Sequence, residues 1–154
     1  MKDNLFKINH FGITVGDLER TRSFYEKLGF EYAGKLTKED GSDVLDYPCY
    51  EELTGVPGCS FKIMMMEGYG ITLEFLQYVV PEEIVIDTKP YIRGTGHLCI
   101  ECTDPIKAYE DLKNSGVEML GKKAVCIDGG THTGVYAYYF KDPDGYILEI
   151  KKEA

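Results

Sequence analysis

The sequence has no apolar run long enough to cross a bilayer, which takes roughly 18–20 consecutive apolar residues. It also has no excess of positive charge, because 26 Asp and Glu residues stand against 17 Lys and Arg residues and give a formal net charge of −9. This shortage of basic residues disfavours a nucleic-acid or membrane-surface partner. The first residues carry no long apolar stretch and no small-residue cleavage site, so we expect no secretory signal.

Cysteine is present without the pattern of a disulfide framework. Five cysteines, an odd number, are typical of a chain from a reducing compartment, and we therefore expect a cytoplasmic protein. Cys99 and Cys102 have C-x-x-C spacing, but on a strand residues three apart face opposite sides, which disfavours a redox pair. The composition is otherwise that of a globular domain, with 44% hydrophobic residues in a chain of 154.

The chain contains an internal repeat. Residues 10–31 align without a gap over residues 97–118, and residues 69–77 align over residues 144–152. The two offsets are 87 and 75 residues, so the first copy holds extra residues, which we place within 32–60. The identical positions are His10/His97, Ile13/Ile100, Asp17/Asp104, Gly29/Gly116, Glu31/Glu118, Gly70/Gly145, Leu73/Leu148 and Glu74/Glu149.

Each copy predicts the same order of elements, βαβββ. A short alternating strand leads to an Asp that suits a helix N-cap, Asp17 or Asp104, and a helix follows in each copy. The apolar residues expected to face the core are Leu18, Thr21, Tyr25 and Leu28 in the first helix, and Ile106, Tyr109 and Leu112 in the second. Further strands are expected at 32–37, 60–67 and 71–78, and at 119–126, 134–141 and 146–151.

The fold class is therefore α+β, with two pseudo-symmetric βαβββ modules. If two curved sheets form a cleft, side chains on their helix-free faces can converge on one point. We expect a single domain over 1–154, with module 1 at about 5–80, a linker at about 81–94 and module 2 at about 95–154. The linker contains Pro81, Pro90 and Gly94, which mark irregular backbone.

Four repeat-related positions hold side chains that bind metals: His10, Glu74, His97 and Glu149. Alternation along each strand places all four on the sheet face opposite the helix. Two imidazoles and two carboxylates suit one divalent ion with positions left open for water or substrate. The residues do not fix its identity, and nickel, cobalt, zinc and manganese all accept these ligands.

The sequence resembles the vicinal oxygen chelate superfamily, whose best-known member is glyoxalase I. The resemblance lies in INHFGITVGDLERTRSFYEKLGF, ITLEFLQY, GTGHLCIEC and YYFKDPDGYILEI. It implies paired βαβββ modules around a metal cleft and a homodimer, with ligands from the first and last strands of each module. Glyoxalase I uses two His and two Glu, which match His10, Glu74, His97 and Glu149.

Related families narrow the expected activity. Methylmalonyl-CoA epimerase usually has Gln at the position of Glu74, dioxygenase relatives need only His10, His97 and Glu149, and bleomycin-binding relatives lack the ligand set. The pattern therefore favours a glyoxalase I-like lyase or isomerase that acts on a small α-oxo compound or its thiol adduct. The chain has only three arginines, which disfavours glutathione as the thiol because Arg is the natural partner of its carboxylates.

The expected chemistry is proton abstraction next to a carbonyl, through an enediolate. A Lewis acid stabilises the negative charge that develops, and a carboxylate takes the proton. We expect Glu149 to be the base and Glu74 to be a ligand or a second acid/base. The open alternatives are an epimerase acting beside a thioester, a non-catalytic small-molecule binding or resistance protein, and an oxygenase.

Other candidate substrate contacts are weaker. Cys99 and Glu101 share the strand face of His97, Met64 and Met66 would give the cleft an apolar wall, and Tyr139 is the cleft candidate in the second copy. His132, in GGTHTG, is expected to be a loop residue, with a substrate-capping role as the alternative.

Overall fold

The computed structural model describes residues 7–154 and divides the chain into two compact units, one that ends at Val85 and a second at Ile86–Ala154. The boundary lies inside the stretch that the sequence predicts as a linker. No helix among the described residues is long and apolar enough to span a membrane.

The two units contain equivalent elements. Unit 1 comprises β1 (Phe11–Thr14), α1 (Leu18–Lys27), β2 (Glu31–Lys35), α2 (Pro48–Thr54), β3 (Ser60–Gly68) and β4 (Ile71–Val80). Unit 2 comprises β5 (His97–Glu101), α3 (Pro105–Asn114), β6 (Val125–Cys126), a 3₁₀ turn (Gly130–His132), β7 (Tyr136–Lys141) and β8 (Ile147–Lys152).

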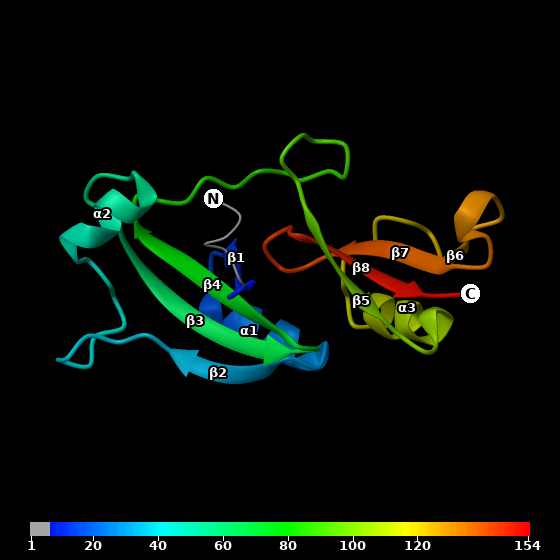
Figure 1. Cartoon of the computed structure of the whole chain (residues 1–154), viewed down its shortest axis with the longest axis horizontal. Coiled ribbons are helices and arrows are strands. Elements are labelled where there is room, and N and C mark those ends of the chain that lie inside the picture. The colour runs from blue at the N-terminus through cyan, green and yellow to red at the C-terminus, as the bar shows by residue number, and fades with distance from the viewer. Residues whose placement is uncertain (1–6) are drawn as a thin grey trace. The chain divides into compact units, whose positions relative to one another are not determined.

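Each unit is built on a four-stranded mixed sheet with the same topology (Figure 1). The strand orders are β1-β4-β3-β2 and β5-β8-β7-β6. In each sheet the first strand pairs in parallel with the last, and the remaining pairs are antiparallel. The structure thus confirms an α+β fold made of two βαβββ modules.

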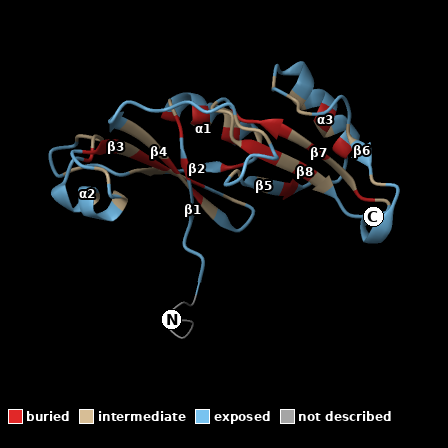
Figure 2. Cartoon of the chain, turned by 90° about the horizontal axis from the view of Figure 1, so that it is seen from above, coloured by how far each residue is buried: buried red, intermediate tan, exposed pale blue. Residues whose placement is uncertain are grey.

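One face of each sheet is covered by a helix and carries the core. In unit 1 the fully buried side chains include Tyr25 of α1 and its sheet partners Met64, Leu73 and Phe75. The rings of Tyr25 and Phe75 lie 4.7 Å apart, which fixes α1 on β4. In Figure 2 the buried residues are concentrated in the sheet strands and on the inner sides of α1 and α3.

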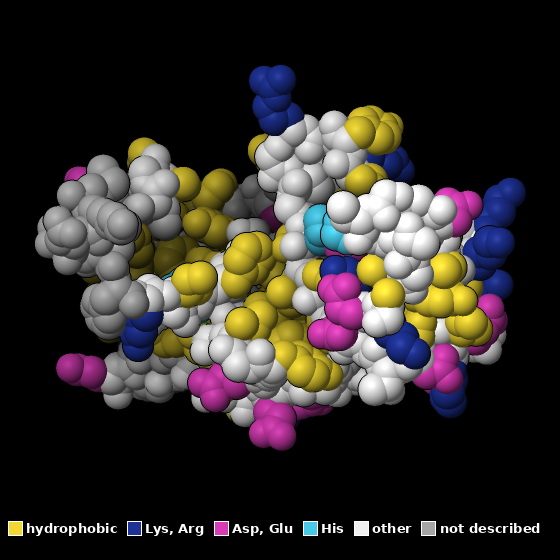
Figure 3. All heavy atoms as spheres, turned by 45° about the vertical axis from the view of Figure 1, so that its right-hand side comes forward, with side chains coloured by type: hydrophobic (Ala, Val, Ile, Leu, Met, Phe, Trp, Pro, Cys, Tyr) yellow, Lys and Arg dark blue, Asp and Glu magenta, His cyan; other side chains and the backbone are white. Residues whose placement is uncertain are grey.

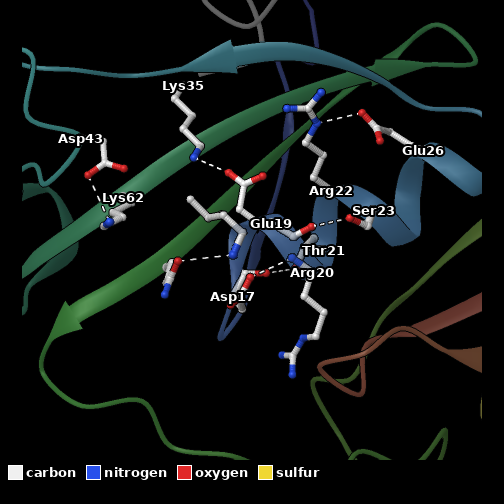
Figure 4. Close-up of polar contacts among 12 residues, drawn as sticks. Asp17, Glu19, Arg20, Thr21, Arg22, Ser23, Glu26, Lys35, Asp43 and Lys62 are labelled. Carbon is white, nitrogen blue, oxygen red and sulfur yellow. Dashed lines mark hydrogen bonds and ion pairs between the residues drawn. The ribbon is translucent and has the colours of Figure 1, made fainter.

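Helix α1 begins where the sequence predicts. Asp17 is the N-cap, and its side chain accepts a hydrogen bond from the backbone N–H of Arg20 at 2.8 Å (Figure 4). Lys35 of β2 forms an ion pair with Glu19 at 2.6 Å, which joins the helix to the edge strand. Asp104 caps α3 in the same way, by accepting from the N–H of Lys107 at 3.0 Å.

The second module departs from the prediction at two places. Ile106 is 56% exposed rather than buried, because Pro105 and Tyr109 form the inner face of α3. The strand expected at 119–126 is reduced to β6, with an isolated bridge between Met119 and Phe140.

Unit 1 contains a helix that the sequence analysis does not predict. Helix α2 lies in the extra segment of the first copy and packs near the ends of β3 and β4 (Figure 1). It lies over a second apolar cluster of buried residues, Leu45, Cys59, Phe61 and Ile63, with Tyr50 and Val56 against it. The ring of Tyr50 lies 4.9 Å from that of Phe61.

Candidate metal centre

The face of each sheet that the covering helix leaves open carries the expected ligands. On β4, Glu74 lies opposite Gly12 of β1 in the parallel pairing. On β8, Glu149 lies opposite Cys99 of β5. The buried residues Leu73 and Phe75 flank Glu74 and point to the core, so alternation places the carboxylate on the other face.

In each unit the histidine and the glutamate form a close pair. The His10 Nε2 atom lies 3.2 Å from Glu74 Oε2, and His97 Nε2 lies 3.1 Å from Glu149 Oε2. In both pairs the His side chain is the more accessible member, at 38% and 43% exposed, and the Glu side chain is largely covered, at 19% and 16%. The two units thus reproduce one local arrangement from repeat-related residues.

The separations within these pairs fit neighbouring ligands of one ion. A ligand nitrogen and a carboxylate oxygen each lie about 2.0–2.2 Å from a bound transition metal, so two ligands at a right angle are separated by about 3.0 Å. Both measured separations are within a few tenths of an ångström of that value. Imidazole with carboxylate also suits the divalent ions that the sequence predicts.

The neighbour of His10 supports the same interpretation. His10 Nδ1 donates a hydrogen bond to the Asn9 side-chain oxygen at 2.8 Å. This leaves Nε2 as the ring nitrogen that faces Glu74. An oxygen partner on the second ring nitrogen is the usual support for a metal-binding histidine.

Each unit alone provides only half of the expected set. Among the described residues, no group of three or more His, Cys, Asp or Glu side chains that could hold a metal is brought together. His10 and Glu74 belong to the first unit, and His97 and Glu149 to the second.

Two of the expected substrate contacts lie beside the second pair. Tyr139 is directly opposite Glu149 across β7 and β8, and its ring centroid lies 5.1 Å from that of His97. Burial raises the pKa of Tyr139, with the charge of Glu149 contributing. Burial and the nearby Glu149 carboxylate raise the pKa of the Cys99 thiol to about 11, so this thiol is protonated at neutral pH.

The remaining candidates have more peripheral positions. Glu101 ends β5, is exposed and lies opposite Lys151 of β8. Cys99 and Cys102 are both free thiols. His132 is exposed in the 3₁₀ turn.

The prediction for Met64 is wrong. Met64 pairs with Phe75 across β3 and β4 and is fully buried on the α1 side, as is Met66. Met65 is the methionine opposite Glu74 and lies on the face of the pair. Three consecutive methionines have no periodicity, so the sequence alone does not show which of them faces the core.

Sequence reasoning also missed Tyr50, whose ring lies 4.9 Å from that of Phe61. Burial raises the pKa of Tyr50, and Cys49, Tyr47 and Glu74 add smaller contributions. The helix that carries Tyr50 has no side-chain cap at its start. Pro48 in its first turn and Gly55 at its C-cap, with φ 70°, are the sequence signals that could have identified this helix.

Charges of both signs are interspersed on the face of the molecule shown in Figure 3. Two of the three arginines, Arg20 and Arg22, lie on α1, on the opposite side of the sheet from Glu74. Arg22 forms an ion pair with Glu26 at 2.8 Å and stacks over the ring of Tyr32.

Comparison with known families agrees with this architecture. The model of the Glyoxalase/Bleomycin resistance protein/Dioxygenase superfamily matches residues 7–150, which is nearly the whole chain. The chain therefore belongs to this superfamily.

Solved structures with the same fold include glyoxalases. A glyoxalase family protein from Bacillus cereus is 17% identical, with a TM-score of 0.78 over 97% of this chain and 95% of that one. The trypanothione-dependent glyoxalase I of Leishmania major is 22% identical, with a TM-score of 0.61 over 97% and 88%. A glyoxalase family protein from Enterococcus faecalis is 20% identical, with a TM-score of 0.62 over 94% and 96%. At these identities the similarity establishes the fold.

Proposed function

We propose that the protein is a metal-dependent lyase or isomerase of the glyoxalase I type. Its substrate is a small α-oxo compound or the adduct of that compound with a thiol. The observation that carries this proposal is the matched pair of His–Glu contacts, at 3.2 and 3.1 Å, in two units of a glyoxalase-superfamily chain.

His10, Glu74, His97 and Glu149 are proposed to hold one divalent ion. In each unit the His–Glu pair has the separation expected of two neighbouring ligands of one ion, which supports this proposal. When bound, the ion would supply Lewis-acid stabilisation of negative charge on the substrate oxygens.

The residues of the chain account for the proton transfer. Glu149 takes the proton from the carbon next to the carbonyl and returns it to the neighbouring carbon, so the step needs neither oxidant nor reductant. Cys99 keeps its proton near neutral pH and lies opposite this carboxylate. Glu74 remains a ligand or the second acid/base.

The assembly and location follow from the same proposal. Superfamily resemblance favours a homodimer, which sedimentation would measure. Five free cysteines suit a cytoplasmic location, which fractionation would test.

The first test is elemental analysis of the purified protein beside His10→Ala and His97→Ala. We expect one divalent ion for each set of four proposed ligands in the wild type, and loss of this ion in both variants. The four ligands are His10, Glu74, His97 and Glu149. The variant His132→Ala is the matched control, because His132 is exposed and belongs to neither pair, and it should retain the metal. A protein that takes up no stoichiometric metal on reconstitution with nickel, cobalt, zinc or manganese contradicts the proposal.

The second test is turnover of methylglyoxal with several thiols, followed by a CoA thioester. Glu149→Gln should lower kcat by about 10²–10⁴-fold, the usual contribution of a general base. Glu74→Gln is the matched variant, and its kcat should fall by a smaller factor than that of Glu149→Gln. Near-wild-type turnover by Glu149→Gln would exclude Glu149 as the base. Ligand binding without metal or turnover would favour the binding-protein alternative.

A further inference from the structure

The histidines of the two His–Glu pairs differ in what supports their rings. His10 Nδ1 is hydrogen-bonded to the side chain of Asn9 at 2.8 Å. The repeat places Gly96 at the position that corresponds to Asn9, so no side chain stands directly before His97. Among the described residues, Glu149 is the one polar group paired with the His97 ring. The second histidine therefore lacks the hydrogen bond that supports the first.

A single polar contact is a weak restraint on a histidine ring. The torsion that turns the ring about its bond to Cβ is broad, because the ring atom that it joins is planar. The contact with Glu149, 3.1 Å at Nε2, fixes one atom of the His97 ring. His97 is also the more accessible member of its pair. A defined orientation of this ring calls for a second contact.

Tyr139 of β7 supplies that contact. It lies directly opposite Glu149 in the antiparallel pairing of β7 with β8. Its neighbours Tyr138 and Phe140 are buried in the core, so alternation places Tyr139 on the open face of the sheet. The ring centroids of Tyr139 and His97 lie 5.1 Å apart, and the ring planes are inclined by 63°. This edge-to-face arrangement is one that aromatic pairs prefer.

Unit 1 has no aromatic ring at the equivalent place. Met65 lies opposite Glu74 in the pairing of β3 with β4, as Tyr139 lies opposite Glu149 in unit 2. The unit that has an amide beside its histidine thus has a thioether on the neighbouring strand, and the unit that has a glycine has an aromatic ring there. Each His–Glu pair has one further contact, which is a hydrogen bond in unit 1 and a ring contact in unit 2.

We propose that Tyr139 is a positioning residue that holds the His97 ring in the orientation for metal binding, as Asn9 does for His10. The role belongs to the aromatic ring of Tyr139 and not to its phenol hydroxyl. This inference rests on the proposed function, because it takes His97 as a metal ligand. It also implies that the support of unit 1 can replace that of unit 2.

Nuclear magnetic resonance of the metal-free protein tests the ring contact itself. The chain has three histidines, so the ring C–H signals of His10, His97 and His132 can each be assigned by substitution with Ala. An aromatic ring 5.1 Å away displaces the signals of its neighbour through its ring current. We expect Tyr139→Leu to move the His97 signals and Tyr139→Phe to leave them near their wild-type positions. Unchanged His10 and His132 signals would show that the fold is intact.

Competition with a chelator for Zn²⁺ tests the positioning role. Tyr139→Leu should weaken Zn²⁺ binding about fivefold, which is the contribution of one aromatic contact. Tyr139→Phe keeps the ring and should bind Zn²⁺ as the wild type does. Tyr91→Leu, at an exposed tyrosine in unit 2, is the matched control and should have no effect.

A rescue variant separates the orientation of His97 from general damage to unit 2. A Cβ atom at Gly96 would meet no atom within 4 Å, and the backbone there is not left-handed, so this position accepts a side chain. Gly96→Asn gives His97 the neighbour that His10 has in Asn9. Combined with Tyr139→Leu, it should restore most of the lost Zn²⁺ affinity. A double variant no better than Tyr139→Leu alone would contradict the positioning role.

Other outcomes also decide the matter. Unchanged Zn²⁺ affinity in Tyr139→Leu would overturn the positioning role, whether or not the His97 signals move. Equal losses in Tyr139→Phe and Tyr139→Leu would overturn it too, because they would assign the effect to the hydroxyl. A wild type that binds no Zn²⁺ would instead contradict the proposed function. A protein whose Zn²⁺ affinity depends on the Tyr139 ring, but which turns over no α-oxo compound, contradicts only the proposed reaction.

Discussion

At the scale of single residues, the two His–Glu pairs were predictable because identical residues occupy corresponding positions of the repeat. His10 corresponds to His97 and Glu74 to Glu149, and the structure brings each His to its own Glu. The orientation of the methionines in β3 was not predictable in the same way. The register between β3 and β4 decides whether Met64 or Met65 faces Glu74. Three consecutive methionines show no alternation of apolar and polar residues, so the sequence does not indicate this register.

The hydrogen bond between Asn9 and His10 leads to a prediction. Asn9→Ala removes the acceptor that fixes the protonated nitrogen and the orientation of the His10 ring. We expect metal affinity to fall about 10–100-fold, the usual effect of losing such a partner, without loss of the fold. Competition with a chelator of known affinity measures the change. Asn114→Ala, at the end of α3, is the control, and equal affinity in the two variants would contradict the role of Asn9.

At the scale of elements, helix starts were predictable and the short elements were not. Asp17 and Asp104 each precede a segment in which apolar residues recur at helical spacing, and both are N-caps in the structure. Helix α2 has neither a capping side chain nor a buried stripe of its own, and it is held by the cluster around Phe61. Such a helix depends on tertiary packing, which sequence periodicity does not report.

The two N-caps give a matched pair of stability predictions. Asp17→Ala and Asp104→Ala each remove one hydrogen bond to a backbone N–H in the first turn of a helix, at 2.8 and 3.0 Å. Each should lower the free energy of unfolding by about 1 kcal/mol. Denaturant titration measures the loss, and Asp128→Ala, in an exposed loop, should fall within about 0.5 kcal/mol of the wild type. If either variant kept the free energy of unfolding of the wild type, packing alone would determine where that helix starts.

At the scale of the whole molecule, duplication accounts for the two matching units. Each βαβββ unit has its own helix-covered core, and each carries one His–Glu pair on the other face of its sheet. The repeat predicted this division, since the same order of elements occurs twice. It did not predict the differences between the units, such as helix α2 in the inserted segment of unit 1 and Gly12 at the position that corresponds to Cys99.

The proposal that both His–Glu pairs hold one ion leads to a prediction for thermal stability. A ligand that binds only the folded state stabilises it, by about 2.7 kcal/mol when its concentration is 100 times its Kd. We expect added metal to raise the Tm of the wild type and a chelator to reverse the shift. If both pairs hold one ion, His10→Ala and His97→Ala should each abolish most of this shift, although the two residues belong to different units. If instead each pair bound its own ion, each variant would keep about half of the shift and elemental analysis would find two ions per chain in the wild type. The combination of stoichiometry and Tm therefore distinguishes one shared centre from two independent ones.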